Sequence, residues 1–288
     1  MQQSHTTIND NLIVVIMAGG VGKRMNSELP KVLHILYEEP MLVHVVKQAI
    51  LLSPSKILIV VGKHMDLIVK TMSTFLGGNS SGNNKSIIQF VEQPEALGTG
   101  NAVQCCMDIL SDQLGRSDAT PLTTPSTTLI LSGDVPLILS STLQDFLDKH
   151  ACNCNKATLM TTYLDNPRGY GRIIEHPTTG KFVKIVEERD CRSLNERNIK
   201  HVNGGIYVFN TATLLKYLPL LRNDTNSQHE YYLTDMIELI HINETETETI
   251  SGLIGVYVVP REKQYQIMGV NTPEQLLEME QNALLLRG

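Results

Sequence analysis

Residues 12–25 have the sequence LIVVIMAGGVGKRM, in which an apolar run is followed at once by a turn rich in glycine. The run is apolar throughout and partly β-branched, which is typical of a strand buried on both faces of a parallel sheet. Glycine allows the backbone to take positive φ and to approach a ligand closely. Because the free N–H groups of such a turn attract anions, we expect a phosphate site at the carboxyl end of this strand.

Cationic side chains follow the glycines: Lys23 and Arg24 come directly after them, and Lys31 comes a few residues later. The turn lacks the G-x-x-x-x-G-K-[ST] pattern of a P-loop, and it also lacks the third glycine of the dinucleotide-binding fingerprint. The alternative interpretation is an ordinary strand-to-helix turn without a ligand.

Composition narrows the classes of protein to consider. A hydrophobic content of 42% in 288 residues suffices for a sizeable core. The net charge of −6 argues against general nucleic-acid binding. No apolar run approaches the roughly 20 residues of a membrane span, and residues 1–11 have the polar character of a flexible tail. Five cysteines without a Cys-x-x-Cys pair indicate reduced thiols and a cytoplasmic protein.

The first half of the chain alternates between strand and helix patterns. We expect strands at 12–17, 56–61, 86–91 and 128–131, helices at 41–52, 65–76 and 98–110, and polar loops at 77–85 and 111–127. This alternation predicts βαβ units and a parallel sheet.

The second half has shorter connections. We expect strands at 156–164, 170–175, 181–187, 201–209 and 253–259, helices at 231–241 and 273–286, and a polar loop at 243–249. The pattern indicates a smaller, partly antiparallel region. We therefore predict one α/β domain over residues 12–288, with a first half at about 12–150 and a second at about 151–288.

Two groups of polar residues lie where the expected strands end. Asp134 follows the strand at 128–131, and a carboxylate there could hold Mg²⁺ beside a phosphate, although it could instead cap a turn. Gln93 follows the third strand, and Gly98 and Thr99 open the next helix with unpaired N–H groups. An amide and free N–H groups could recognise the edge of a base, and an ordinary helix cap at Thr99 is the alternative.

Further candidate residues lie at strand ends in the second half, namely 170–173 with Gly171, Glu187, and 203–205 with Asn203. A carboxylate, an amide and backbone N–H groups could together bind sugar hydroxyls. Each of these signals is weak alone.

Eight segments occur in the order found in one family. They are AGGVGKRM with LPK, EQPEALGTG, SGDVPLI, GYGRI, IVEERD, VNGGIY, EYYLTD and GVN. The chain resembles the sugar-nucleotide pyrophosphorylases, which are nucleotidyltransferases with a Rossmann-like GT-A-type α/β fold. It is most similar to the uridyltransferase domain of the bacterial bifunctional N-acetylglucosamine-1-phosphate uridyltransferase, without the acetyltransferase domain.

The resemblance implies a role for each matched residue. Catalytic contacts to phosphate would come from Arg24 and Lys31, and Mg²⁺ would be held by Asp134 and Asn271. The nucleotide would contact Ala18, Gly19, Gly20, Gly22, Lys23, Gln93, Gly98, Thr99 and Gly133. The sugar phosphate would contact Gly171, Glu187, Asn203 and Thr234. Ser132 stands where close relatives have tyrosine.

The implied reaction joins UTP and N-acetylglucosamine 1-phosphate with release of pyrophosphate, in a monomer or small homo-oligomer. The sequence contains no evident general base. None is needed, because the second pKa of a phosphate monoester is about 6 and the attacking group is already largely dianionic. The alternatives are a uridylyl- or thymidylyltransferase acting on glucose 1-phosphate, and a non-catalytic sugar-nucleotide binding protein. A glycosyltransferase would carry an Asp-x-Asp metal motif, whereas Ser132 precedes Asp134 by two residues.

Overall fold

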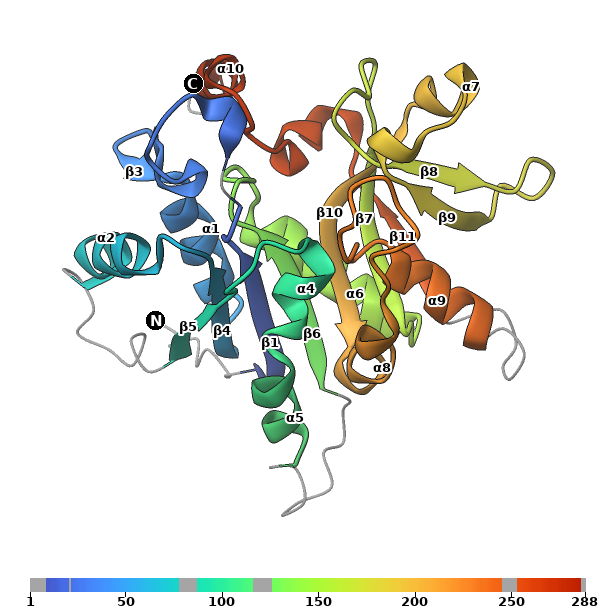
Figure 1. Ribbon diagram of the computed structural model, residues 1–288, viewed down its shortest axis with the longest axis horizontal. Helices are drawn as coiled ribbons and strands as arrows, with labels where there is room; N and C mark the ends of the chain where they lie inside the picture. The colour runs from blue at the N-terminus through green and yellow to red at the C-terminus, as the bar shows by residue number, and fades with distance from the viewer. Residues whose placement is uncertain (1–8, 21, 78–86, 116–125, 245–252, 286–288) are drawn as a thin grey trace, which may run out of the picture.

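The computed structural model describes residues 9–20, 22–77, 87–115, 126–244 and 253–285, which fold around one large sheet (Figure 1). Seven strands of this part of the chain lie side by side in the order β11–β7–β10–β6–β1–β4–β5, and β8 and β9 extend from β10. The bounds are β1 Asn9–Met17, β4 Pro54–Val61, β5 Ile88–Glu92, β6 Thr127–Ser132, β7 Ala157–Tyr163, β8 Arg172–Glu175, β9 Phe182–Val186, β10 His201–Asn210 and β11 Ile254–Val258. A separate short hairpin is formed by β2 Ile35–Leu36 and β3 Glu39–Pro40.

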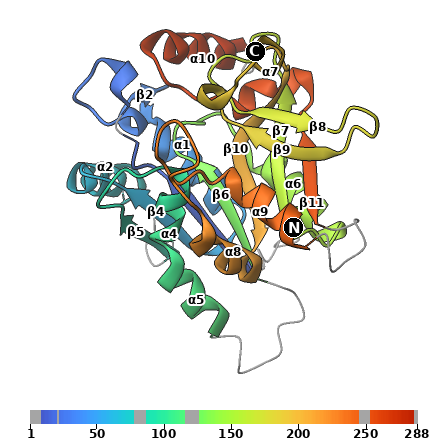
Figure 2. The ribbon, with the colours of Figure 1, turned by 45° about the vertical axis from the view of Figure 1, so that its right-hand side comes forward.

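The strand directions confirm the predicted mostly parallel sheet. β1 is parallel to β4 and to β6, and β4 is parallel to β5. β10 runs antiparallel to β6 and to β7. The smaller antiparallel region is the β8–β9 hairpin, which extends from β10 away from β1 (Figures 1 and 2).

The order of the first strands creates a topological switch point. From β1 the chain adds β4 and β5 on one side and then β6 on the other. Open α/β sheets bind ligands at the carboxyl ends of strands at such a point, because connections leave in opposite directions and open a crevice there. The glycine turn follows β1, so it lies at this crevice.

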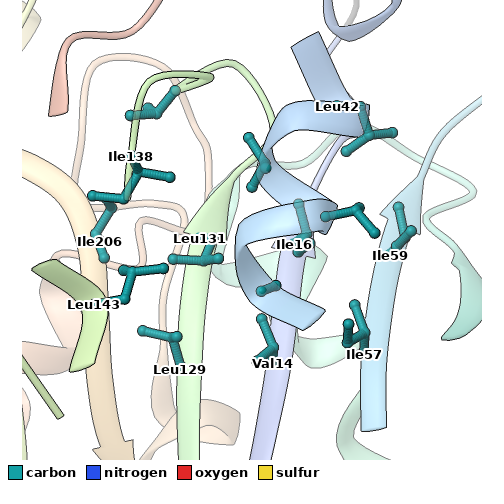
Figure 3. Close-up of a cluster of buried hydrophobic side chains, with 14 of the residues drawn as sticks. Val14, Ile16, Leu42, Ile57, Ile59, Leu129, Leu131, Ile138, Leu143 and Ile206 are labelled. Carbon is teal, nitrogen blue, oxygen red and sulfur yellow. The ribbon is translucent and has the colours of Figure 1, made fainter. Parts of the chain in front are cut away.

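Alternate residues of β1 enter two different cores. Val14 and Ile16 pack on the face covered by α1 (Met41–Ile50), α2 (Met65–Gly77) and α6 (Ser140–Cys152), as Figure 3 shows for its labelled residues. Ile13 and Val15 pack on the opposite face. That face is covered by α4 Thr99–Gln104, α5 Met107–Gly115, α8 Thr211–Tyr217 and α9 Asp235–Glu244. Burial on both faces explains why residues 12–17 of the strand are all apolar.

A third, smaller core anchors the end of the chain. Met279 of α10 (Pro273–Leu285) packs with Val270 against Leu36 and Met41. This contact brings the segment before α10 back to the first half of the chain. None of the described helices is long and apolar enough to cross a bilayer.

Several predicted boundaries were wrong. The single helix expected at 98–110 is broken between α4 and α5, where the N–H of Cys106 bonds the carbonyl of Val103 three residues back. The predicted loop at 111–127 starts too early, since α5 continues to Gly115 and β6 begins at Thr127. Hydrophobic periodicity does not register a break that is only two residues long.

The chain ends and the last polar loop also differ from expectation. β1 begins at Asn9, so three residues assigned to the tail belong to the strand. The helix expected at 231–241 begins at Asp235, because the backbone of Tyr231 is engaged with Leu97 and Gly100. The same helix continues to Glu244 and takes the first residues of the expected loop at 243–249. Residues 1–8, 78–85, 116–125 and 245–249 of the expected tail and loops lie outside the described part.

Three helices of the described residues were not predicted, namely α6, α7 (Leu194–Arg197) and α8. α6 carries Leu143, Phe146 and Leu147 at helical spacing, a signal present in the sequence but preceded by a polar first turn. α8 begins after Asn210, whose side chain accepts a hydrogen bond from the N–H of Thr213 at 3.0 Å. Such a cap satisfies a backbone donor that the helix leaves free.

Candidate active site

The glycine turn is tied to both neighbours of β1. The N–H of Ala18 donates to Val60 at 2.7 Å, and the N–H of Gly133 donates to Met17 at 2.9 Å. Gly22 has a φ of 64°, and a Cβ at that position would lie 2.6 Å from the Cβ of Lys31. The turn therefore depends on glycine both for its backbone conformation and for the close approach of Lys31.

Lys31 lies at the centre of a polar cluster. Its ammonium contacts the carboxylate of Asp134 and donates to Oδ1 of Asn271 at 3.0 Å. Arg24, which is exposed, donates from Nη2 to the same Oδ1 at 3.0 Å. The hydroxyl of Ser132 donates to Oδ1 of Asp134 at 2.6 Å. The structure thus brings together two cations, Lys31 and Arg24, and the side-chain oxygens of two residues, Asp134 and Asn271, that lie far apart in the sequence.

The ionisation of Asp134 follows from these contacts. Burial alone would raise the pKa of this carboxyl. The charge of Lys31 and the hydrogen bonds from Lys31 and Ser132 outweigh burial, so the pKa is lowered. Asp134 is therefore a carboxylate at neutral pH.

The segment after β5 presents Gln93 at the edge of the crevice. Its side-chain N–H₂ group donates to the carbonyl of Gly98 at 3.1 Å and to Oδ1 of Asn101 at 2.9 Å. Gly98 has a φ of 108°, and the hydroxyl of Thr99 accepts from the N–H of Leu233 at 3.0 Å. The ordinary-cap interpretation of Thr99 does not hold, because this hydroxyl serves a distant segment and α4 has no side-chain cap.

A second set of residues gathers at the ends of β8, β9 and β10. Glu187 follows β9 and accepts a hydrogen bond from the hydroxyl of Thr234 at 3.0 Å. A Cβ at Gly171 would lie 3.5 Å from both carboxylate oxygens of Glu187. Asn203 of β10 donates from Nδ2 to the hydroxyl of Tyr207 at 2.6 Å. Burial raises the pKa of Glu187, and the bond from Thr234 only partly opposes that effect.

These residues line two cavities that share a wall. The larger, of about 530 Å³, is bounded by the glycine turn, Gln93, Gly98 and Asp134, and we call it the nucleotide cavity. The smaller, of about 190 Å³, is bounded by Gly171, Glu187, Asn203 and Thr234, and we call it the sugar cavity. Four residues line both, namely Met17, Thr99, Ser132 and Asp134. Asp134 therefore stands at the junction of the two cavities.

Most of the residues predicted from the sequence line these cavities, and four do not. Arg24 and Asn271 line neither cavity and lie beside Lys31, where Oδ1 of Asn271 accepts from both cations. Gly133 uses its N–H within the sheet edge. The side chain of Lys23 lies outside the described part, although its backbone begins the short 3₁₀ turn Lys23–Met25.

Sequence reasoning missed several contributors to the cavity walls, including three residues whose polar side chains can reach a ligand. Arg189 and Gln228 line the nucleotide cavity from the second half of the chain, and Tyr207 lines the sugar cavity. Arg189 belongs to the matched segment IVEERD, so a signal for it was present. Nothing local in the sequence indicated Gln228.

Comparison with known proteins agrees with this arrangement. Residues 13–251 match the family described as nucleotidyl transferase, and the chain belongs to that family. It is 38% identical over 276 residues to the "Probable UDP-N-acetylglucosamine pyrophosphorylase" of Acanthamoeba polyphaga mimivirus, covering 96% of this chain and 97% of that one.

Other relatives are longer than this chain. It is 41% identical over 228 residues to the "Bifunctional protein GlmU" of Trichodesmium erythraeum, covering 79% of this chain and 45% of that protein. It is 39% identical over 267 residues to the protein of the same name from Nitrosomonas eutropha, covering 51% of that relative. The chain thus spans about half the length of these bifunctional relatives.

A solved structure shares the fold. It comes from Bacillus anthracis, is assigned provisionally as a glucose-1-phosphate thymidylyltransferase and was determined in complex with sucrose. The TM-score is 0.65 at 17% sequence identity, over 94% of this chain and 95% of that one. The likeness confirms the predicted fold class.

Proposed function

We propose that the protein is a UTP:N-acetylglucosamine-1-phosphate uridylyltransferase that forms UDP-N-acetylglucosamine and pyrophosphate. The observation that carries this proposal is the pair of adjoining cavities with Asp134, Ser132 and Thr99 in the shared wall. A transferase of this kind must hold a nucleotide and a sugar phosphate end to end, with the α-phosphorus where the two sites meet. The names of the relatives favour uridine and N-acetylglucosamine as the two halves.

Positioning and charge account for the chemistry in this proposal. The dianionic sugar phosphate attacks the α-phosphorus in line, the new P–O bond forms, and pyrophosphate leaves with the electrons of the broken bond. Arg24 and Lys31 stabilise the charge that grows on the leaving pyrophosphate. Holding both substrates in one crevice converts a bimolecular reaction into an effectively unimolecular one. No side chain has to remove a proton.

The described residues also fit a divalent cation. The carboxylate of Asp134 and Oδ1 of Asn271 converge on the ammonium of Lys31, so the space between these oxygens already accommodates a positive group. Mg²⁺ binds through one or two protein oxygens and completes its shell with phosphate oxygens and water. Among the residues that the structure describes, no three His, Cys, Asp or Glu side chains cluster for a metal, which suits a site completed by substrate. Asp134 and Asn271 would hold the ion, which would neutralise phosphate charge.

In the sugar cavity, Glu187, Asn203 and Gly171 would bind the hydroxyl and amide groups of the sugar. The hydrogen bond from Thr234 holds Glu187 in place. Glu187 is a good acceptor for hydroxyl donors even where its pKa is raised, because either protonation state retains a carbonyl-type oxygen.

The test is a matrix of nucleotide triphosphates and sugar 1-phosphates, with pyrophosphate release and the product sugar nucleotide both measured in the presence of Mg²⁺. We expect UTP with N-acetylglucosamine 1-phosphate to be the best pair. A preference for glucose 1-phosphate or dTTP would overturn the substrate assignment. If no substrate pair released pyrophosphate although UTP bound tightly, the protein would instead be a binding protein without transferase activity.

Two variants separate the cavities. Glu187→Gln should raise KM for the sugar phosphate and leave KM for UTP within about twofold, since Glu187 lines only the sugar cavity of the two. Glu262→Gln is a matched control, because this exposed carboxylate lines neither cavity.

A further inference from the structure

Three side-chain amides form a chain behind the nucleotide cavity. Gln104 donates from Nε2 to the backbone carbonyl of Leu218 at 3.0 Å. Asn101 donates from Nδ2 to Oε1 of Gln104 at 3.5 Å, and Oδ1 of Asn101 accepts from Nε2 of Gln93 at 2.9 Å. The chain ends at Gln93, which is 6% exposed and lines the nucleotide cavity.

The direction of this chain is determined by its two backbone contacts. A backbone carbonyl only accepts hydrogen bonds, so the group of Gln104 that faces Leu218 must be its N–H₂ group. By the same argument the N–H₂ group of Gln93 must face the carbonyl of Gly98. Asn101 lies between the two and can satisfy both only with Oδ1 toward Gln93 and Nδ2 toward Gln104.

The consequence is that Gln93 keeps an acceptor, its Oε1, on the side of the nucleotide cavity lined by Gly19. Its Oε1 lies against Gly19 of the glycine turn, where an added Cβ would come within 2.7 Å. Neither of its two amide hydrogens is left for the cavity, because Gly98 and Asn101 take both. The sequence showed an amide that could either donate or accept, whereas the structure leaves only acceptance.

We propose that Asn101 and Gln104 are positioning residues that determine nucleobase choice. They hold Gln93 with its oxygen toward the base. The site then favours a base whose N3 donates a hydrogen bond over a base whose N3 accepts one. This inference rests on the proposed function, since it concerns the nucleotide of the same site. Uracil has an N3–H donor, and the equivalent atom of cytosine is an acceptor that would face the oxygen of Gln93. Thymine also has N3–H, so the amide chain does not separate uracil from thymine.

Accommodating cytosine would require the amide of Gln93 to turn over. Its oxygen would then face the carbonyl of Gly98 and Oδ1 of Asn101, and both would lose their donor. Sites built around a particular hydrogen bond reject analogues that leave buried polar groups unpaired. Removing the oxygen of Asn101 halves this penalty and should admit CTP more readily.

The experiment compares UTP and CTP in three variants. Asn101→Ala removes the acceptor for Gln93, whereas Asn101→Asp keeps one and is the matched control. Gln104→Met removes the partner of Asn101. We expect Asn101→Ala to lower the UTP preference in kcat/KM about tenfold, the factor for one buried hydrogen bond left unmade. We expect about threefold for Gln104→Met, because the bond between Gln104 and Asn101 is long, and a retained preference in Asn101→Asp.

The outcomes are distinct. If the variants lost UTP and CTP turnover in equal proportion, Asn101 and Gln104 would have a structural role only, and the proposal would be overturned. So would a wild-type protein that does not discriminate the two nucleotides. Dissociation constants for UTP and CTP, measured by calorimetry on the same variants, test the amide chain even if no pyrophosphate is released, so failure of the proposed transferase activity can be told apart from failure of this inference.

Discussion

Gly22→Ala tests whether the glycine turn controls the position of Lys31. Gly22 has a φ of 64°, which an L-residue adopts at a cost of about 1 kcal/mol. The new Cβ would lie 2.6 Å from the Cβ of Lys31 and 3.4 Å from its Cα. Carbon atoms pack at about 3.5 Å or more, so the two segments must separate by about 1 Å. Rotation of the Lys31 side chain cannot relieve the contact, because Cβ and Cα are fixed to the backbone.

Two effects of different size should follow. Forcing a methyl group into such a contact costs about 1–3 kcal/mol of folding free energy, in addition to the backbone strain. A displacement of about 1 Å at a catalytic group lowers turnover about 100-fold. We therefore expect kcat to fall far more than the modest fall in melting temperature would suggest.

Gly180→Ala is a matched control for Gly22→Ala. Gly180 also has a φ of 64°, but nothing lies within 4 Å of a Cβ placed there. It should show the backbone cost of about 1 kcal/mol and normal turnover. The assays are thermal unfolding and steady-state pyrophosphate release for both variants. A Gly22→Ala protein whose kcat matches that of Gly180→Ala would refute the reasoning.

Three further outcomes are expected. Lys31→Met should lower kcat by about 100- to 1,000-fold, because it removes a preorganised charge from the leaving group, and near-normal turnover would contradict its assigned role. Chelation of divalent cations should abolish pyrophosphate release, and Asp134→Asn should raise the Mg²⁺ concentration for half-maximal rate about tenfold or more; an unchanged Mg²⁺ requirement would exclude Asp134 as a ligand. Burial, with help from neighbouring carboxylates, raises the pKa of Asp235 to about 6. The folded state therefore disfavours ionisation of Asp235. The stability that the neutral acid contributes to the folded protein is lost as pH rises from about 4 to about 6. Two effects reduce the expected gain, namely the partial exposure of Asp235 and the loss of its favourable interaction with the start of α9. The free energy of unfolding of Asp235→Asn, measured by chemical denaturation, should therefore be about 1 kcal/mol higher than that of the wild type at pH 8 and equal to it at pH 4.

The sequence determined the elements whose signals are local. The run at 12–17 indicated a doubly buried strand, and the structure buries alternate residues of β1 in two separate cores. The glycines and the strand-end position of Asp134 predicted polar groups at one sheet edge. The matched segments extended this to residues such as Asn271, whose contact with the first half no spacing could reveal.

Tertiary structure alone decided how these parts meet. Lys31 and Asn271 are 240 residues apart and touch because α10 packs Met279 against Leu36 and Met41. Arg189 and Gln228 line the nucleotide cavity only because the second half of the chain lies against the first. Such contacts follow from strand order and from packing between distant elements, which local periodicity does not encode.

The orientation of Gln93 shows the same division most clearly. The sequence predicted an amide at the crevice, and an amide can donate or accept. Only the carbonyls of Gly98 and Leu218, acting through Asn101 and Gln104, engage its N–H₂ group and leave its oxygen on the side of Gly19. The physical reason is that residue type sets which hydrogen bonds a side chain can make, while its folded neighbours decide which of them it makes.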